Sequence, residues 1–506
     1  MIISGERQID YPEIRVRAAK AAGGFKALGL RPAGTVGLML RNDFALFEAS
    51  AAASMLGSNV VPINWHLKSE EVGYILADSG AQILVCHADL LPQIRDGIPA
   101  NVEVLIVATP PEIAAAFGIA ADQTCVPEGM RDWNVWRESH EALQDVPLRA
   151  GPMFYTSGTT GRPKGVRRQP MSAEQIAASE RIGGLTYGVK PGEGQVVLMN
   201  GPMYHSAPNS YGMLAFRSEC TIVLEPRFDP EDMLQLIVKH RVTNMHMVPT
   251  MFVRLLRLPE EVKSRYDLSS LRFIVHGAAP CPIHVKQAMI AWWGPVINEY
   301  LGSTETGIPI WHNSAEALAK PGTVGRLIEG GALKIFAEDG RECAVDEPGE
   351  IFMRQMSVSD FDYQGRSAER LEAGRGALVS VGDVGYLDAD GFLFLCDRKR
   401  DMVISGGVNI YPAEIENTLI GLDGVRDCAV FGVPDDEFGE RLVACIELED
   451  GVALEVPVVQ AYLRQRLANF KVPKEVLFVP AMPREASGKI FKRKLRDQYL
   501  AKTFPS

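Results

Sequence analysis

The clearest sign of the architecture is the apolar run Thr35-Val36-Gly37-Leu38-Met39-Leu40, whose length and composition suit a buried strand. From Phe44 to Met55 apolar residues recur at helical spacing, and Gly57 stands where such a helix would stop. The pattern therefore predicts a strand followed directly by a helix.

The same alternation continues along the chain. Residues 59–63 and 81–85 are again strand-like, and between them Ser69, followed by two glutamates, marks the start of a helix. Further on, 230–241 is helix-like and 272–275 is strand-like. Alternating strands and helices indicate a parallel sheet that is covered on both faces.

After about residue 330 the pattern changes to short strands separated by glycine turns, such as 338–341 and 388–391, which suggests an antiparallel or barrel-like β subdomain. The charge cluster at 397–401 is typical of a linker, and the rest of the chain predicts a small α+β unit. This unit is expected to contain helices from Pro412 and over 457–467 and strands at 429–433 and 443–447. The predicted class is α/β, with layered sheets in a large N-terminal domain and a small C-terminal domain.

The 506 residues are 46% apolar and 23% charged, as in an ordinary globular protein, and the net charge of −11 argues against a nucleic-acid binder. No uncharged apolar run reaches the roughly 18 residues of a membrane span, and the N-terminus lacks the features of a secretory signal. The eight cysteines include no Cys-x-x-Cys pair. We therefore expect reduced cysteines and a cytoplasmic protein.

The strongest chemical signal is the segment from Tyr155 to Gly165, Tyr-Thr-Ser-Gly-Thr-Thr-Gly-Arg-Pro-Lys-Gly. Its glycines let backbone N–H groups turn toward an anion, its hydroxyls can donate hydrogen bonds and Lys164 adds a positive charge, which together suit a polyphosphate. A flexible polar loop is the alternative, and the density of donors disfavours it. The segment is not a Walker A loop, because Pro163 replaces the required glycine and Gly165 the required Ser or Thr.

Three other patterns are weaker. His140-Glu141 begins a zinc-protease pattern, but Gln144 stands at the second histidine position. Asp388-x-Asp390-Gly391 suggests a calcium loop, but the later carboxylates are wrongly spaced and a hairpin turn fits better. His205 could be a general base, although a lone histidine is more often structural.

Five motifs occur in a fixed order, at 155–165, 299–305, 382–386, 397–407 and 483–489. After the first, they read Glu-Tyr-Leu-Gly-Ser-Thr-Glu, Gly-Asp-Val-Gly-Tyr, Asp-Arg-Lys-Arg-Asp-Met-Val-Ile-Ser-Gly-Gly and Pro-Arg-Glu-Ala-Ser-Gly-Lys. In this combination the chain resembles, essentially from end to end, the adenylate-forming superfamily of acyl-CoA synthetases, luciferases and peptide-synthetase adenylation domains. It is most similar to the bacterial fatty-acid and bulky-acid CoA ligases.

The resemblance implies an N-terminal adenylation domain over 1–397 with the acyl and ATP sites, a hinge at 398–401 and a mobile C-terminal lid domain over 402–506. It also implies an ATP-dependent acid–CoA ligase that uses Mg²⁺. A carboxylate attacks the α-phosphorus of ATP to give acyl-AMP and pyrophosphate, and the CoA thiol then displaces AMP. Because two anions meet in the first step, cations must neutralise the reacting centre.

The resemblance also implies roles for individual residues. The catalytic set would be Lys489, between the attacking carboxylate and the α-phosphate; Thr304, on the α-phosphate; Glu305, which with Thr156 holds Mg²⁺; and His205, a gate between acyl pocket and CoA tunnel. The β- and γ-phosphates would be cradled by Thr156, Ser157, Gly158, Thr159, Thr160 and Lys164. The adenine would be surrounded by Gly277, Ala278, Ala279, Glu299, Tyr300, Leu301 and Gly302, and the ribose bound by Asp383 and Arg398. The hinge position would be Arg400, and the pantetheine tunnel would be lined by Gly406 and Gly407.

One position departs from the family. Leu301 stands where the family usually has an aromatic ring that stacks on adenine. Tyr300 is expected to point elsewhere, because successive side chains alternate in an extended segment. Trp292 and Trp293 are expected to serve packing and not cofactor contacts.

Several alternatives stay open. The acyl group could pass to a carrier protein, although no carrier domain is recognised after Lys489, and a luciferase-like oxidation or a non-catalytic nucleotide-binding module are further alternatives. The expected pocket segments 205–212 and 277–279 are small and apolar, which favours a hydrophobic fatty acid and a role in lipid metabolism. An aryl or steroid-like acid is left open, as is a homodimer.

Overall fold

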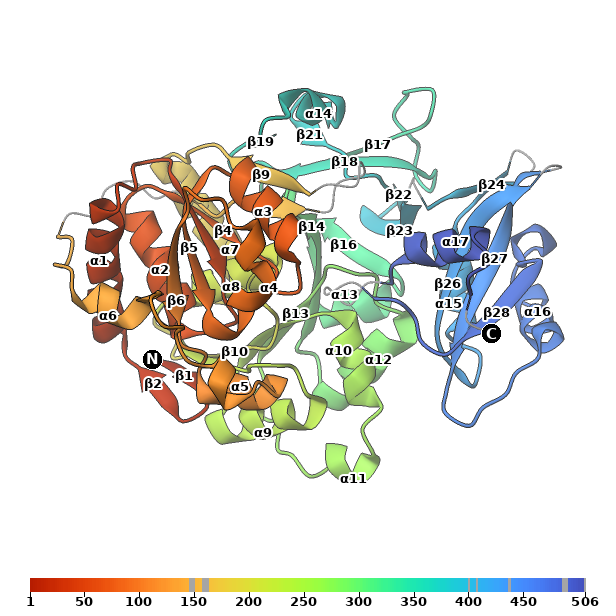
Figure 1. Ribbon diagram of the computed structural model, residues 1–506. Helices are drawn as coiled ribbons and strands as arrows, with labels where there is room; N and C mark the ends of the chain where they lie inside the picture. Colours follow the sequence, from red (N-terminus) through yellow and green to blue (C-terminus); the bar gives the residue numbers. More distant parts are fainter. Residues whose placement is uncertain are drawn as a thin grey trace. The chain divides into compact units, whose positions relative to one another are not determined.

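The computed structural model describes residues 1–144, 151–156, 163–398, 401–405, 408–435, 438–484 and 490–504, with only the backbone at 397, 398, 404, 408, 409 and 439 (Figure 1). The chain divides into two compact units. The first comprises Met1–Ala319, Ile328–Ala332 and Arg354–Val379, and the second comprises Lys320–Leu327, Leu333–Met353 and Ser380–Ser506. The mixed α/β class is confirmed, whereas the boundaries at 397 and 402 stay predictions.

The first unit contains a parallel five-stranded sheet in the order β4-β3-β5-β6-β7. Its strands are β3 (Thr35–Met39), β4 (Asn59–Pro62), β5 (Ala81–His87), β6 (Glu103–Val107) and β7 (Arg131–Asp132). Val36 and Leu38 face a core shared with α2 (Phe44–Met55), whereas Met39 faces a core shared with α3 (Ser69–Asp78). Both faces are therefore covered, as the alternating pattern predicted.

A second sheet of the first unit runs in the order β2-β1-β11-β10-β12-β13-β14-β15. Neighbours from β1 to β14 are parallel, and β2 and β15 pair antiparallel with β1 and β14. The strands are β1 (Ile2–Ser4), β2 (Arg7–Ile9), β10 (Val196–Met199), β11 (Thr221–Leu224), β12 (Asn244–Met247), β13 (Phe273–His276), β14 (Ile297–Ser303) and β15 (Gly307–His312).

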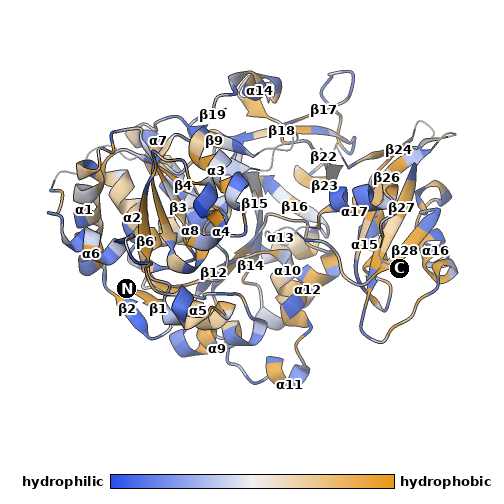
Figure 2. Ribbon diagram, viewed as in Figure 1, coloured by the Kyte–Doolittle hydropathy of each residue, from blue (hydrophilic) through white to orange (hydrophobic). Residues whose placement is uncertain are grey.

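Helices accompany both sheets, and the strands of the five-stranded sheet are coloured largely as hydrophobic in Figure 2. The longer helices are α1 (Tyr11–Ala27), α7 (Ala173–Tyr187), α8 (Ser206–Arg217), α9 (Pro230–His240), α10 (Pro249–Leu256) and α12 (Ile283–Trp293). The shorter ones are α4 (Leu91–Ile94), α5 (Pro111–Phe117), α6 (Trp133–Glu138), α11 (Glu260–Lys263), α13 (Ser314–Ala319) and α14 (Ser367–Glu372). The predicted helix at 230–241 and strand at 272–275 are confirmed by α9 and β13. Trp293 is buried in a core that Trp292 packs against, which confirms their packing role.

The second unit begins with antiparallel strands, as the glycine turns predicted. They are β16 (Thr323–Leu327), β17 (Gly331–Phe336), β18 (Gly349–Gln355), β22 (Asp383–Leu387) and β23 (Phe392–Arg398). Between the last two, the backbone N–H of Gly391 donates to the carbonyl oxygen of Asp388 at 3.0 Å. The segment is therefore a hairpin turn, as the sequence favoured.

The C-terminal part of the second unit is the expected α+β structure, with a sheet in the order β25-β24-β27-β26 and β28 paired to β27. Its elements are β24 (Val403–Ser405), β25 (Val408–Ile410), α15 (Pro412–Leu419), β26 (Val425–Asp435), β27 (Gly439–Leu448), α16 (Val456–Arg464), β28 (Glu475–Val479) and α17 (Lys492–Leu500). All eight cysteines are unbridged, as expected. No helix in the described ranges is long and apolar enough to cross a membrane.

A buried carboxyl group links the stability of the first unit to pH. Glu225 follows β11 and is 3% exposed, and its Oε1 accepts a hydrogen bond from the backbone N–H of Asp229 at 2.9 Å. Its Oε2 has no hydrogen-bond partner among the described residues. Burial raises the pKa of Glu225 to about 8, and the neighbouring Asp232 and Asp229 carboxylates act in the same direction.

Glu225→Gln is expected to flatten the pH dependence of stability. Because the folded-state pKa lies above the usual 4.5, the folded chain binds the extra proton between these values, and the free energy of unfolding should fall as pH rises through that window. Glutamine mimics the protonated carboxyl and should remove about 1 kcal/mol or more of that fall, since one unit of pKa shift is worth about 1.4 kcal/mol. Urea unfolding of both proteins at several pH values measures this, and parallel curves would contradict it.

Candidate active site

The predicted phosphate segment is the connection of a β-hairpin. β8 (Phe154–Thr156) pairs antiparallel with β9 (Lys164–Arg168), and Thr156 lies directly opposite Lys164. β9 also pairs with β19 (Phe361–Tyr363). The predicted phosphate contacts Ser157, Gly158, Thr159 and Thr160 lie outside the described residues, so the structure places the two ends of the segment.

The structure brings together the two residues predicted to hold Mg²⁺. The Thr156 hydroxyl donates a hydrogen bond to Oε1 of Glu305 at 3.2 Å, and the carboxylate is largely buried. The Tyr363 hydroxyl lies 3.4 Å from the same oxygen. Burial, followed by the Glu305 charge, raises the pKa of Tyr363, so this phenol remains a hydrogen-bond donor.

Arg168 fixes the backbone that carries Thr304 and Glu305. Its guanidinium donates to the carbonyl oxygen of Thr304, to that of Glu305 at 3.1 Å and to that of Ser359 at 2.7 Å. Burial lowers the pKa of Arg168 to about 10, and the Glu305 charge opposes this. The side chain therefore stays charged at neutral pH and holds the motif through its main chain.

Thr304 contacts the first residue of α8, which directly follows His205 in the chain. The Thr304 hydroxyl donates to Oγ of Ser206 at 2.9 Å, and Ser206 is the first residue of the helix. His205 directly precedes it, with its ring centroid 4.4 Å from that of Tyr204. Two residues of the predicted catalytic set are therefore connected through Ser206.

Lys164 has a protein partner in this structure. Its ammonium group forms an ion pair with Glu369 and lies 5.3 Å from the ring centroid of Tyr363. The ion pair lowers the pKa of the Glu369 carboxyl. A phosphate contact of Lys164 therefore requires that it share or exchange Glu369.

The segments predicted to surround adenine approach each other closely at two glycines. A Cβ on Gly277 would lie 2.6 Å from the ring of Tyr300, and a Cβ on Gly302 would lie 2.2 Å from the carbonyl oxygen of Gly307, so neither position has room for a side chain. The Tyr300 hydroxyl hydrogen-bonds to Nε2 of His246 at 2.9 Å. The Tyr300 ring is thus turned into the core, as strand alternation predicted, while Leu301 is half-buried.

The carboxylate of Glu299 is engaged away from the predicted adenine position. It forms an ion pair with Lys286 of α12 and accepts a hydrogen bond from Nε2 of His312 at 2.7 Å, with Nδ1 of His276 3.9 Å away. Burial alone would raise the pKa of Glu299, but the Lys286 charge and the hydrogen bond from His312 hold it well below its usual range. Glu299 therefore stabilises the junction of β13, β14 and β15, and only its main chain is left for a nucleotide.

The predicted ribose-binding pair lies in the second unit. Asp383 of β22 and Arg398 of β23 are opposite each other in the antiparallel register. The predicted residues Arg400, Gly406, Gly407 and Lys489 lie outside the described residues. Their roles stay predictions.

Sequence profiles of known families match most of the chain. The AMP-binding enzyme profile matches residues 1–360, and the profile of the AMP-binding enzyme C-terminal domain matches residues 414–489. The chain belongs to the AMP-binding enzyme family. The resemblance drawn from the five ordered motifs is thereby confirmed.

Relatives and a solved structure cover nearly the whole chain. The long-chain-fatty-acid–CoA ligase FadD13 of Mycobacterium tuberculosis is 32% identical over 98% of this chain and 94% of its own length. The feruloyl-CoA synthase of an Amycolatopsis species is 32% identical over 98% of this chain and 95% of its own. The crystal structure of ATP-bound MatB from Rhodopseudomonas palustris superposes with a TM-score of 0.83 at 26% identity, covering 99% of this chain and 96% of that one. The chain is therefore an enzyme of the adenylate-forming acid–CoA ligase class, for which an acid, ATP and CoA are fitting substrates.

Three contributors to the site were not predicted from the sequence: Arg168, Tyr363 and Glu369. Ser206 was expected only as part of the pocket segment 205–212, and its contact with Thr304 was not predicted. A basic residue on the strand that leaves the phosphate segment was a usable signal for Arg168. Tyr363 reaches Glu305 only because β19 pairs with β9, a contact across nearly 200 residues that leaves no local pattern.

Leu301→Tyr is expected to tighten ATP binding by about two- to tenfold. An aromatic contact is worth roughly 0.5–1.5 kcal/mol beyond the burial of area, and about 1.4 kcal/mol corresponds to a tenfold change in affinity. Leu301 is half-buried and pairs with Ile310, so a ring there could extend from the surface of β14. Calorimetric titration with ATP measures the change. Weaker ATP binding together with an altered range of acids would place this side chain in the acyl pocket.

Proposed function

We propose that this chain is an AMP-forming ligase that joins a hydrophobic fatty acid to CoA through an acyl-AMP intermediate. The observation that supports it most is the contact between Thr156, at the end of the phosphate segment, and Glu305, with Thr304 beside it. In an AMP-binding enzyme this arrangement puts a hydroxyl and a carboxylate where a metal-bound polyphosphate would lie. A cytoplasmic location and a homodimer remain predictions.

The oxygens of Thr156 and Glu305 fit Mg²⁺. This ion prefers hard oxygen ligands and usually takes one or two from the protein beside waters and substrate phosphates. In the described ranges no group of three His, Cys, Asp or Glu could hold a metal ion, so a site completed by phosphate and water suits this chain better than an all-protein cage. When bound, Mg²⁺ would offset the charge of the polyphosphate.

The residues of this chain divide between the two proposed steps. In the first, a carboxylate oxygen bonds to the α-phosphorus and the bond to the β-phosphate oxygen breaks, so pyrophosphate leaves. Thr304 would donate to the α-phosphate, and Lys489 would neutralise the carboxylate as it approaches. Asp383 and Arg398 would hold the ribose.

In the second step the CoA sulfur bonds to the acyl carbon and AMP leaves. The thiol would pass Gly406 and Gly407, and His205 would separate the acyl pocket from this tunnel. The step would follow rotation of a lid over 402–506 about a hinge at 398–401 that includes Arg400.

An aryl acid is the second candidate substrate. Tyr211 of α8 is buried among aromatic side chains. Its ring centroid is 5.6 Å from that of Tyr187 and 5.9 Å from that of His246. The feruloyl-CoA synthase is as similar to this chain as the fatty-acid ligase is, which supports an aryl acid as the alternative.

The proposal is tested by pyrophosphate release over a panel of fatty, aryl and steroid-like acids, with ATP and Mg²⁺. We expect release that requires the acid, and a thioester and AMP once CoA is added. Release without any thioester, restored by an acyl-carrier protein, would favour the carrier alternative. No acid-dependent release from any member of the panel would overturn the proposed function.

A further inference from the structure

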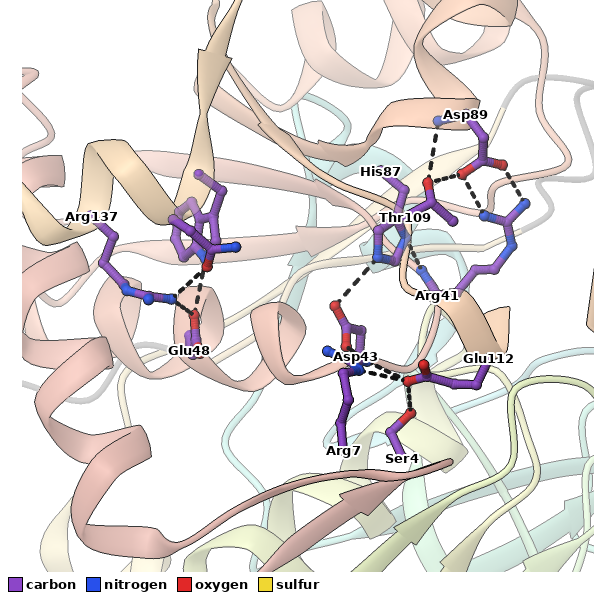
Figure 3. Close-up of polar contacts among 12 residues, drawn as sticks. Ser4, Arg7, Arg41, Asp43, Glu48, His87, Asp89, Thr109, Glu112 and Arg137 are labelled. Carbon is purple, nitrogen blue, oxygen red and sulfur yellow. Dashed lines mark hydrogen bonds and ion pairs between the residues drawn. The ribbon is translucent and has the colours of Figure 1, made fainter. Parts of the chain in front are cut away.

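Charged side chains that pair with one another gather at the carboxyl end of the five-stranded sheet. The strand order reverses at β3, which has β4 on one side and β5 on the other, and in open parallel sheets ligands usually bind at such a point. Here Arg41 forms two hydrogen bonds to Asp89, at 2.9 and 2.8 Å, and His87 lies 3.4 Å from Asp43 (Figure 3). These four side chains therefore pair with one another in the crevice at this point.

Asn42, between Arg41 and Asp43, reaches out of this crevice to another segment. Its Nδ2 donates to the carbonyl oxygen of Gly201, and its Oδ1 accepts from the backbone N–H of Met203, both at 2.9 Å. Asn42 is 4% exposed, so these bonds form in a dry environment. The two bonds fix both ends of a three-residue turn between β10 and α8.

This turn leads directly to His205. The backbone N–H of His205 donates to the carbonyl oxygen of Pro202 at 3.1 Å, which continues the turn, and Nδ2 of Asn209 donates to the carbonyl oxygen of Met203 at 2.8 Å. Ser206 follows and contacts Thr304. A side chain that fixes Gly201 and Met203 therefore also fixes the place from which His205 and Ser206 extend.

The residue next to Asn42 is itself held rigidly. Arg7 donates to Asp43 at 2.7 Å and also pairs with Glu112, so Asp43 lies between Arg7 and His87 in Figure 3. Burial alone would raise the pKa of Asp43, but His87 and Arg7 lower it to about 2. The carboxylate thus stays charged at any ordinary pH, and the backbone at Asn42 has a fixed anchor.

We propose that Asn42 is a positioning residue for the ligase reaction, which holds the Gly201–Met203 turn so that His205 and Ser206 lie correctly beside Thr304. Only an amide of this length supplies a donor for Gly201 and an acceptor for Met203 together. The inference rests on the proposed function, because the role of His205 belongs to it.

The test is a double-mutant cycle with a matched control. Asn42→Ala should lower kcat/KM for the acid by about tenfold in thioester formation, as for coupled neighbours, and leave the KM for ATP near its original value. In a His205→Ala background the same change should have little further effect. The control is Asn244→Ala, because Asn244 is equally buried and its Nδ2 donates to the carbonyl oxygen of Gly188 at 2.9 Å, away from the turn. This variant should lose stability without the kinetic change.

Two further measurements keep the inference testable if Asn42→Ala does not fold or the acid is not found. Asn42→Asp keeps the acceptor for Met203 but loses the donor to Gly201, and can replace alanine in the cycle. Hydrogen exchange measures these bonds without any activity. The Met203 amide should exchange faster in Asn42→Ala than in Asn244→Ala, whereas Asn42→Asp, which keeps the acceptor, should leave this amide protected. Independent effects of Asn42 and His205, an equal kinetic loss in the control, or unchanged exchange of the Met203 amide in Asn42→Ala would each overturn the inference. Failure of the acid panel with faster Met203 exchange would instead count against the proposed function alone.

Discussion

Glu305→Gln is expected to slow acid-dependent pyrophosphate release by about 10²-fold or more, the usual cost of losing one key electrostatic group. Glutamine keeps the length and shape of the side chain and can still accept hydrogen bonds from Thr156 and Tyr363, whose oxygens lie 3.2 and 3.4 Å from Oε1. The main-chain bonds from Arg168 do not depend on the carboxylate. The loss should therefore come from charge, and the requirement for Mg²⁺ should shift to higher concentration.

The measurement is the rate of pyrophosphate release as a function of Mg²⁺ concentration. A matched control is Glu48→Gln, because Glu48 is also a buried glutamate, which lies in α2 and pairs with Arg137 at 2.7 Å. That variant should be less stable but show the original Mg²⁺ dependence. If Glu305→Gln keeps the original dependence as well, the metal ligand must lie elsewhere.

Local patterns predicted the elements whose boundaries depend on nearby residues. α2 runs from Phe44 to Met55 as the apolar spacing indicated, and Gly57, with φ of 64°, follows it in the left-handed region. β26 and β27 are longer than the apolar runs at 429–433 and 443–447. Their pairing continues through Pro434 and Glu440, because backbone hydrogen bonds extend a hairpin beyond its apolar part.

The partners of the Glu299 side chain could not be predicted from such patterns. The resemblance implied that Glu299 is one of the residues around adenine, and the structure shows its carboxylate buried with Lys286 and His312, each 13 residues away in opposite directions. Burial of a carboxylate is tolerated only where cations and donors meet it, and here they come from one helix and one neighbouring strand. This partnership depends on how α12 and β15 pack around β14 and has no local signature.

The pair Thr156 and Glu305, in contrast, was expected from the family resemblance, because each residue lies in one of the family's motifs. The structure adds the reason that two residues 149 positions apart can act together, since Arg168 leaves the phosphate segment on β9 and holds the backbone of Thr304 and Glu305. The motif therefore predicts which groups meet, and the pairing of strands explains how they are held.

The largest loss is expected for Lys489→Ala, which should lower acyl-AMP formation by about 10³-fold but leave thioester formation from supplied acyl-AMP nearly unchanged. The reason is that the ammonium group would interact with the carboxylate and the α-phosphate only as their charges are brought together, so its stabilisation belongs to the first transition state. Once acyl-AMP exists, that repulsion is gone, and the second step no longer requires the charge at this place.

Two assays on one preparation separate the steps, namely pyrophosphate release with acid and ATP, and thioester formation with acyl-AMP and CoA. Lys494→Ala removes the same charge from an exposed position of α17 five residues away and controls for the net charge of the C-terminal segment. It should leave both rates near the original values. An equal loss in both steps for Lys489→Ala would mean that the lysine also acts on the thiol or on the leaving AMP. The charge would then serve the nucleotide throughout the reaction, and a lid that removes Lys489 after the first step would no longer be needed to explain the order of events.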